Sequence, residues 1–253
     1  MSLKGNAQLA AIPSCAMSPS HALRDILKGP LPPLMLPPRT LVRSLTINQQ
    51  SQQLDKMTDS PLRSEDSIPL QAQPLIKAGL GSQGLLPTDT DYEPWVDSYW
   101  CNSAKLRPAC IFQPRSAPDV AKAVVALAQA RQLFAIRGGG HMNWPGSNNI
   151  TDGVTIDLAL LNATTYDSDT KLAHVGPGAK WKDVYAELDN HGRVVVGARE
   201  AEVGVGGFLL GGGNTYYTPR YGFACDNIDA YEVVLTDGRI VTAEAGGDTA
   251  GKF

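Results

Sequence analysis

The stretch RGGGHMNWPGSNNI, residues 137–150, decides the fold of this chain. It follows a short apolar run, LFAI at 133–136, and a histidine stands directly after its three glycines. One interpretation is structural: a tight turn that needs positive φ, or a close approach of two backbone segments. The other is functional, because consecutive N–H groups of a bare backbone form a concave nest that suits a pyrophosphate.

A second glycine-rich stretch, VGVGGFLLGGGN at 203–214, favours the functional interpretation. Six of the ten residues from Gly204 to Gly213 are glycine. Two such loops, each near the end of an apolar run, predict a shared ligand that is approached by backbone from both sides. The sequence has no phosphate loop of the GxxxxGK[ST] type, which disfavours kinase or ATPase chemistry. The formal GxGxxG match at 79–84 is interpreted as accidental, because Pro87 interrupts the helix that should follow it.

Hydrophobic periodicity places strands and helices around these two loops. The mixture predicts an α+β fold, and the Asp237-Gly238 pair predicts a hairpin within 228–243. Ser116 and Asp119 are expected to form a capping box at the start of the first helix. The expected strands are 109–114, 133–137, 153–158 and 171–177, and the expected helices are 117–131 and 180–192.

The first 74 residues differ in composition from the rest. All seventeen aromatic residues lie at Tyr92 or later, whereas 30–38 and 48–53 are rich in proline and glutamine. A segment without aromatic side chains is a poor core builder, so 1–74 is predicted to be a mostly disordered N-terminal extension, with an interaction tail as the alternative. Residues 75–104 are then a lead-in segment, and 105–253 form the ligand-binding domain.

Charge and cysteine content narrow the class of protein. A formal net charge of −3 gives no basic field for nucleic acid, and no run approaches the ~18 apolar residues of a membrane helix. The four cysteines show no CxxC pair and no metal-ligand spacing, so neither a metal site nor a disulfide framework is predicted. The first residues do not resemble a signal peptide, which favours the cytoplasm without settling the localisation. No nucleic acid, membrane or protein partner is expected.

Three segments together resemble an FAD-binding domain of the vanillyl-alcohol-oxidase, or PCMH, type. They are 113–158, 175–197 and 203–243, and they occur in the family's order and spacing. Within that superfamily the chain resembles the berberine-bridge-enzyme-like oxidoreductases, in particular the fungal members. The likeness covers about residues 75–243 and implies a domain of two α/β subdomains.

The resemblance implies FAD as the cofactor. In the family, the histidine of the R-[SG]-G-G-H loop is bonded to the 8α-methyl of the flavin, and His141 stands at that position. Many relatives carry a second tether, a cysteine three residues before the valine of VGxGG. Here that valine is Val203 and the tether position holds Glu200, so one covalent bond is expected. Cys225 is interpreted as a buried small residue.

The FAD contacts expected from the resemblance lie on both glycine segments and on the last predicted strand. They are Arg137, Gly138, Gly139, Gly140, His141, Met142, Asn143, Gly146, Ser147, Val203, Gly204, Gly206, Gly207, Gly211, Gly212, Gly213, Asn214, Ile240 and Val241.

The implied function is FAD-dependent oxidation of a small-molecule alcohol or amine, in secondary metabolism, with dioxygen as the electron acceptor. The chain ends in VTAEAGGDTAGKF, before the segments that build the substrate domain of complete relatives, so the domain is expected to be incomplete at its C-terminus. The alternative is therefore a truncated flavin-binding module or pseudo-enzyme without turnover. No catalytic base is named; His174 and His191 are candidates by residue type only.

Overall fold

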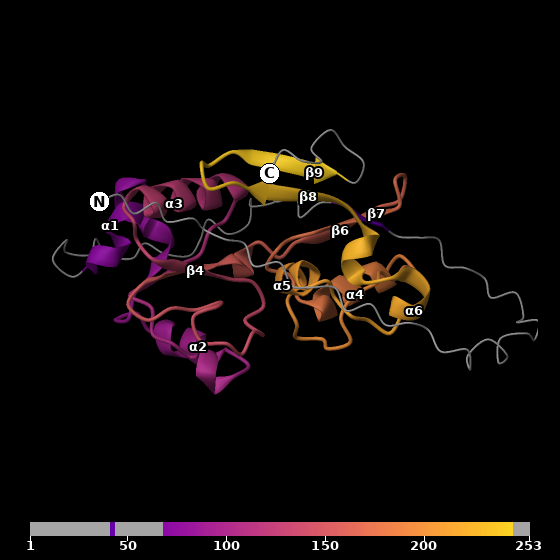
Figure 1. Cartoon of the computed structure of the whole chain (residues 1–253), viewed down its shortest axis with the longest axis horizontal. Helices are drawn as coiled ribbons and strands as arrows, with labels where there is room; N and C mark the ends of the chain where they lie inside the picture. Colours follow the sequence, from indigo (N-terminus) through magenta and orange to yellow (C-terminus); the bar gives the residue numbers. More distant parts are fainter. Residues whose placement is uncertain (1–40, 44–67, 245–253) are drawn as a thin grey trace, which may run out of the picture. The chain divides into compact units, whose positions relative to one another are not determined.

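The computed structural model describes residues 41–43 and 68–244, and Figure 1 shows their helices and strands. The described residues form two β-sheets, with strand orders β2-β3-β5-β4 and β6-β7-β1-β8-β9. The strands are β1 (Leu41–Arg43), β2 (Gly84–Leu85), β3 (Cys110–Phe112), β4 (Phe134–Arg137), β5 (Val154–Asp157), β6 (Thr164–Asp167), β7 (Leu172–Val175), β8 (Ile228–Val234) and β9 (Ile240–Glu244). The helices are α1 (Gln73–Lys77), α2 (Tyr92–Asp97), α3 (Ala117–Gln129), α4 (Trp181–Asp189), α5 (Val205–Leu210) and α6 (Thr218–Tyr221). The predicted α+β class is confirmed.

The four-stranded sheet is a buried layer between helices. Strands β3, β5 and β4 run parallel, and β2 pairs antiparallel with β3. Every residue of β3 and β5 is buried, as expected for parallel strands covered on both faces. Phe112 packs with Leu75 of α1 and Leu127 of α3, whereas its neighbour Ile111 packs with Trp95 of α2. Alternate side chains of β3 thus face opposite sides of the sheet. In Figure 1, α1 and α3 lie on one side of β4 and α2 lies on the other.

Helix α3 begins where the sequence predicts. The Oγ of Ser116 accepts a hydrogen bond from the N–H of Asp119 at 3.3 Å, which satisfies one free donor of the first turn. The carboxylate of Asp119 accepts from the N–H of Arg115 at 3.2 Å, one residue earlier than a capping box requires. The predicted N-terminus is confirmed, and the return bond of the cap is shifted by one residue.

The five-stranded sheet combines two antiparallel hairpins, β6–β7 and β8–β9, with β1 running parallel to both β7 and β8 between them. Helix α4 buries Trp181, Val184 and Leu188 in a core that includes Val175 of β7. The predicted hairpin turn is confirmed, because Gly238 adopts φ +86° between the paired ends of β8 and β9. Strand β6 was not predicted from periodicity.

The boundary of the predicted extension at residue 74 is wrong. Residues Leu70–Ala72 form a 3-10 turn that leads into α1, and Ala72 is buried in the same core as Phe112. Residues Leu41–Arg43 form β1. Aliphatic side chains and backbone pairing can join a core or a sheet without aromatic residues, so aromatic content misplaced the boundary. The remainder of the predicted extension, 1–40 and 44–67, lies outside the described residues.

The second glycine segment is not a continuous loop. Its middle forms α5, because Val205 and Leu209 lie one turn apart and are both buried in the core around Trp181. This packing outweighs the low helix propensity of glycine. The GxGxxG match at 79–84 forms a 3-10 turn, Gly81–Gln83, that precedes β2 instead of following a strand. That placement agrees with its interpretation as accidental.

Candidate functional site

The two glycine segments, 137–150 and 203–214, meet in the structure where Gly139 contacts Gly204, a contact that we call the glycine junction. A Cβ built on Gly139 would overlap the backbone N and Cα of Gly204, and one built on Gly204 would overlap the backbone of Gly139. Close beside them, built Cβ atoms on Gly138 and Gly206 would lie 3.4 and 3.1 Å from the carbonyl oxygen of Pro177. Close backbone packing is therefore the role of Gly139 and Gly204. The same contact brings both segments to one place, as a shared ligand would require.

Other glycines of the two segments face open space. Built Cβ atoms on Gly146, Gly207 and Gly212 would meet nothing within 4 Å, and Gly207 is exposed. Within the described residues, the backbone N–H groups of Gly139, Gly140 and His141 make no hydrogen bond. Adjacent N–H donors without a protein acceptor suit a nest of the kind that binds phosphate groups.

Arg137 lies at the end of β4 and is only 8 % exposed. Its guanidinium carbon lies 3.9 Å from the ring centroid of Tyr99 and 4.7 Å from that of Trp95. The Nη2 atom donates to the Oγ of Ser98 at 2.8 Å. The buried Nη1 atom has no partner among the described residues. A buried guanidinium N–H without an acceptor is unfavourable, so this atom suits an anionic or carbonyl oxygen of a bound group.

Asp157 holds the indole ring of Trp95, which faces the guanidinium of Arg137. It is 2 % exposed at the end of β5 and accepts from the indole Nε1 of Trp95 at 2.6 Å. The amide of Gln113 donates to the same oxygen at 3.2 Å. Because Trp95 is held by this bond, the ring that faces the guanidinium has a defined position.

The other predicted site residues are placed as follows. His141 is half-buried, and the loop after it is exposed at Met142, Asn143, Gly146 and Ser147. On the second segment, Val203 accepts from the N–H of Trp181, Gly211 ends α5, Gly213 packs on Phe208, and Asn214 is exposed. Ile240 and Val241 open β9, opposite Val234 and Val233 of β8. Their contact with a cofactor stays a prediction.

Sequence reasoning missed the residues that line the first glycine loop from the side. Ser98, Tyr99, Trp100 and Ser103 all contact residues within 137–149. The available signal was aromatic clustering, since four aromatic side chains occur between Tyr92 and Trp100 after none in the preceding 91 residues. Aromatic residues concentrated directly before a predicted ligand loop indicate a wall of that site.

A charged cluster holds the second segment against the start of α4. The Nζ atoms of Lys180 and Lys182 lie 2.6 and 2.7 Å from the carboxylate of Glu202. The hydrogen bonds from Lys180 and then Lys182 lower the pKa of Glu202 to about 2. An isolated bridge between Lys180 and Gly204 continues this contact to the glycine junction.

Glu202→Gln is expected to lower the melting temperature slightly at neutral pH, because exposed ion pairs stabilise little. The folded-state pKa lies below the ordinary value, so the stabilisation is present above pH 4.5 and lost as pH falls toward about 2. The difference in melting temperature between wild type and variant should therefore shrink over that range in thermal melts followed by circular dichroism. Glu200→Gln is the control, and a difference that stays constant with pH would contradict the role of Glu202.

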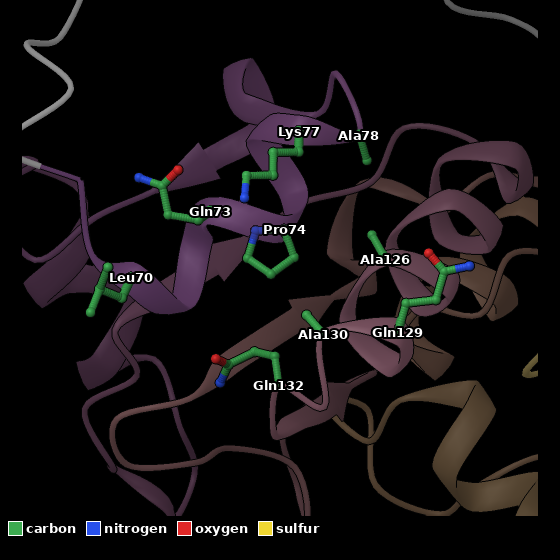
Figure 2. Close-up of a pocket in the computed structure, with 9 residues that line it drawn as sticks. All are labelled: Leu70, Gln73, Pro74, Lys77, Ala78, Ala126, Gln129, Ala130 and Gln132. Atoms are coloured by element: carbon green, nitrogen blue, oxygen red, sulfur yellow. The ribbon is translucent and has the colours of Figure 1, made fainter.

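A surface hollow of about 510 Å³ lies elsewhere, between α1 and the end of α3 (Figure 2). Leu70, Pro74, Ala126 and Ala130 give it alkyl walls, and Lys77 is the single charged group of its lining. The remaining lining residues are Gln73, Ala78, Gln129 and Gln132. Amides and methyl groups supply neither an acid–base pair nor a nucleophile, so the chemistry of the chain points to the glycine junction.

The two candidate histidines have other partners. His191 lies 3.2 Å from the carboxylate of Glu187 and its ring centroid lies 5.1 Å from that of Tyr166, while His174 faces Thr165 across the β6–β7 hairpin. Within residues 41–43 and 68–244, no cluster of histidine, cysteine and acidic side chains could hold a metal ion. No helix in these ranges is long and apolar enough to cross a membrane. Cys225 is half-buried, not buried as predicted.

Comparison of the sequence with known proteins assigns the part of the chain that contains the glycine junction to a protein family. Residues 108–244 match the family model described as FAD binding domain. FAD-dependent monooxygenase sdcF of Emericella nidulans is 42% identical over 171 residues, which are 67% of this chain and 36% of that protein. FAD-dependent monooxygenase tpcD of Cochliobolus heterostrophus is 40% identical over 158 residues, 62% of this chain and 30% of that protein. The chain spans about a third of the length of the curated relatives that it matches.

Solved structures agree with this assignment. The crystal structure of 6-hydroxy-D-nicotine oxidase from Arthrobacter nicotinovorans superposes with a TM-score of 0.60 at 30% identity, over 64% of this chain and 35% of that one. The berberine-bridge-enzyme-like protein BBE-like 1 of Physcomitrella patens superposes with a TM-score of 0.63 at 25% identity, over 71% of this chain and 38% of that one.

Proposed function

Because this chain belongs to the FAD-binding domain family of FAD-linked oxidoreductases, we propose that it holds FAD for the oxidation of a small-molecule alcohol or amine in secondary metabolism. Dioxygen is the proposed electron acceptor, and His141 is the proposed point of covalent attachment. The observation that carries the proposal is the junction itself: His141 directly follows glycine N–H groups that have no acceptor among the described residues.

The residues present fit FAD. The free N–H groups of Gly139 and Gly140 suit the pyrophosphate, and the unpartnered Nη1 of Arg137 suits one further oxygen of the cofactor. Gly207 leaves open space on the second segment, where a side chain would block close approach. These features lie within one small region of the fold, which supports a single dinucleotide site.

In this proposal the protein binds and orients, and the cofactor supplies the redox chemistry. Bound FAD provides an acceptor for two electrons and a proton from the substrate carbon. Arg137 is held by Tyr99, Trp95 and Ser98, so its charge is fixed before the cofactor arrives. Such a preorganised charge stabilises an anionic group without reorganisation when the group binds.

In a covalent complex, the imidazole of His141 would hold the flavin through a C–N bond to the 8α-methyl. Forming that bond would replace one C–H bond of the methyl and the N–H bond of the imidazole, and dioxygen would take up the two electrons and two protons to give hydrogen peroxide. A covalent nitrogen substituent withdraws electrons and raises the reduction potential of the cofactor, which favours oxidation of substrate. The half-buried position of His141 leaves the imidazole accessible for this bond.

The names of the relatives support this substrate class. 6-Hydroxy-D-nicotine oxidase is named for an amine substrate and xylooligosaccharide oxidase for a sugar substrate. The curated fungal relatives are named monooxygenases, which also use dioxygen. Oxidase and monooxygenase are both names for enzymes that consume dioxygen, which supports dioxygen as the proposed oxidant.

The full chain should retain FAD through gel filtration and lose its yellow absorbance when mixed anaerobically with compounds from a panel of alcohols and amines. Admission of oxygen should restore the absorbance. A chain that retains no FAD would contradict the proposed function. Retained FAD that dithionite bleaches, but no member of the panel bleaches, would contradict the proposed oxidation and favour the alternative of a flavin-binding module without turnover.

A further inference from the structure

Trp100 stacks on the imidazole of His141. The ring centroids lie 5.0 Å apart and the planes are inclined by 19°. Trp100 is 65 % exposed, so its position is not explained by burial in a core. Across the described part of the chain, no hydrogen bond reaches the ring nitrogens of His141, which leaves the stack as the contact that orients the imidazole.

The segment that carries Trp100 is fastened to the glycine loop on both sides of the stack. Before it, the hydroxyl of Tyr99 donates to the carbonyl of Asn148 at 2.8 Å, and burial raises the pKa of Tyr99, which keeps this donor protonated. After it, the hydroxyl of Ser103 donates to the carbonyl of Asn143 at 2.6 Å. The side chains of Tyr99 and Ser103 therefore hold the segment that carries Trp100 against the loop of His141.

We propose that Trp100 is a positioning residue for His141, which sets the plane of the imidazole for attachment of the flavin. The inference rests on the proposed tether through His141. Rotation about the Cβ–Cγ bond of a histidine has a broad, roughly two-fold profile, so an unsupported ring samples many orientations. The lone pair of a ring nitrogen lies in the plane of the ring. A partner stacked on the face therefore restricts rotation and leaves the reacting edge open.

The test compares Trp100→Ala, Trp100→Phe and Trp144→Ala in the full chain. Trp144 is 71 % exposed on the loop that carries His141 and is a matched control for loss of a surface indole. Flavin-free protein is mixed with FAD, and attachment is followed as flavin fluorescence of the denatured band. At saturating FAD, Trp100→Ala should slow attachment about 3- to 10-fold, as expected for loss of one aromatic contact. Trp100→Phe should restore most of the rate, and Trp144→Ala should match wild type.

A second readout does not use the cofactor. The indole ring current should shift the ring-proton resonances of His141 in the flavin-free chain, and Trp100→Ala should remove that shift while Trp144→Ala keeps it. Equal attachment rates in wild type and Trp100→Ala, or a Phe variant as slow as the Ala variant, would overturn the inference and leave the tether intact. Wild-type protein that binds FAD without any covalent bond would overturn the tether, and the positioning role with it.

Discussion

His141→Ala is expected to abolish covalent flavin attachment and to leave FAD bound non-covalently. The N–H groups of Gly139 and Gly140 and the Nη1 of Arg137 do not depend on the imidazole, so the dinucleotide should keep most of its polar contacts. Denatured wild-type protein should carry the flavin mass on the peptide that contains His141, and the variant should carry none. A variant that still holds flavin after denaturation would show that another residue forms the bond.

Cysteines are the rival attachment points, and Cys101→Ala and Cys225→Ala serve as controls. Cys101 lies beside Ser103, which lowers the pKa of its thiol through a hydrogen bond and also contacts the loop of His141. Burial raises the pKa of Cys225, which makes its thiolate scarcer at neutral pH. Glu200 stands at the position that the family resemblance predicts for a second tether, and a carboxylate cannot form a thioether. Both cysteine variants should keep wild-type attachment; a flavin mass on a cysteine peptide would contradict the single tether.

The sequence was most informative where local patterns and tertiary packing agree. Short apolar runs in the sequence predicted the parallel core strands. Ser116 predicted the N-terminus of α3, and the Asp237-Gly238 pair predicted the hairpin turn. In each case the signal lies within a few residues of the feature. The glycine segments were also recognised, and the family match over 108–244 confirms the predicted FAD-binding fold.

What the sequence did not reveal depends on contacts between distant segments. Trp100 and His141 are 41 positions apart, and their stack exists because Tyr99 and Ser103 fasten one segment to the other. Helix α5 forms within a glycine-rich stretch because Val205 and Leu209 reach a core built largely by α4 and β7. The hydrophobic periodicity of one segment carries no information about which distant segment its side chains will contact.

Gly139→Ala is expected to destabilise the fold strongly and to abolish FAD retention. The added Cβ would overlap the backbone of Gly204, and backbone atoms cannot rotate away as a flexible side chain can. Overpacking costs about 1–3 kcal/mol or more, and the upper end applies here because both neighbours are main chain. About 3 kcal/mol corresponds to a melting temperature lower by roughly 6–12 °C for a domain of this size. Gly204→Ala should act alike, since it overlaps Gly139 in return.

Gly207→Ala is the matched control near the same junction. It distinguishes an effect on fold stability, which arises from backbone packing, from an effect on FAD affinity. Its Cβ would meet nothing within 4 Å, and Gly207 lies in α5, where alanine favours the helix by about 0.5–1 kcal/mol. The variant should melt at or slightly above the wild-type temperature and yet bind FAD more weakly, because we propose that the cofactor approaches the open face of Gly207. Thermal melts of flavin-free protein and FAD titrations measure the two effects separately. A Gly139→Ala variant that melts like wild type would contradict the backbone contact between Gly139 and Gly204. Unchanged FAD affinity in Gly207→Ala would contradict the proposed contact between the cofactor and the second glycine segment.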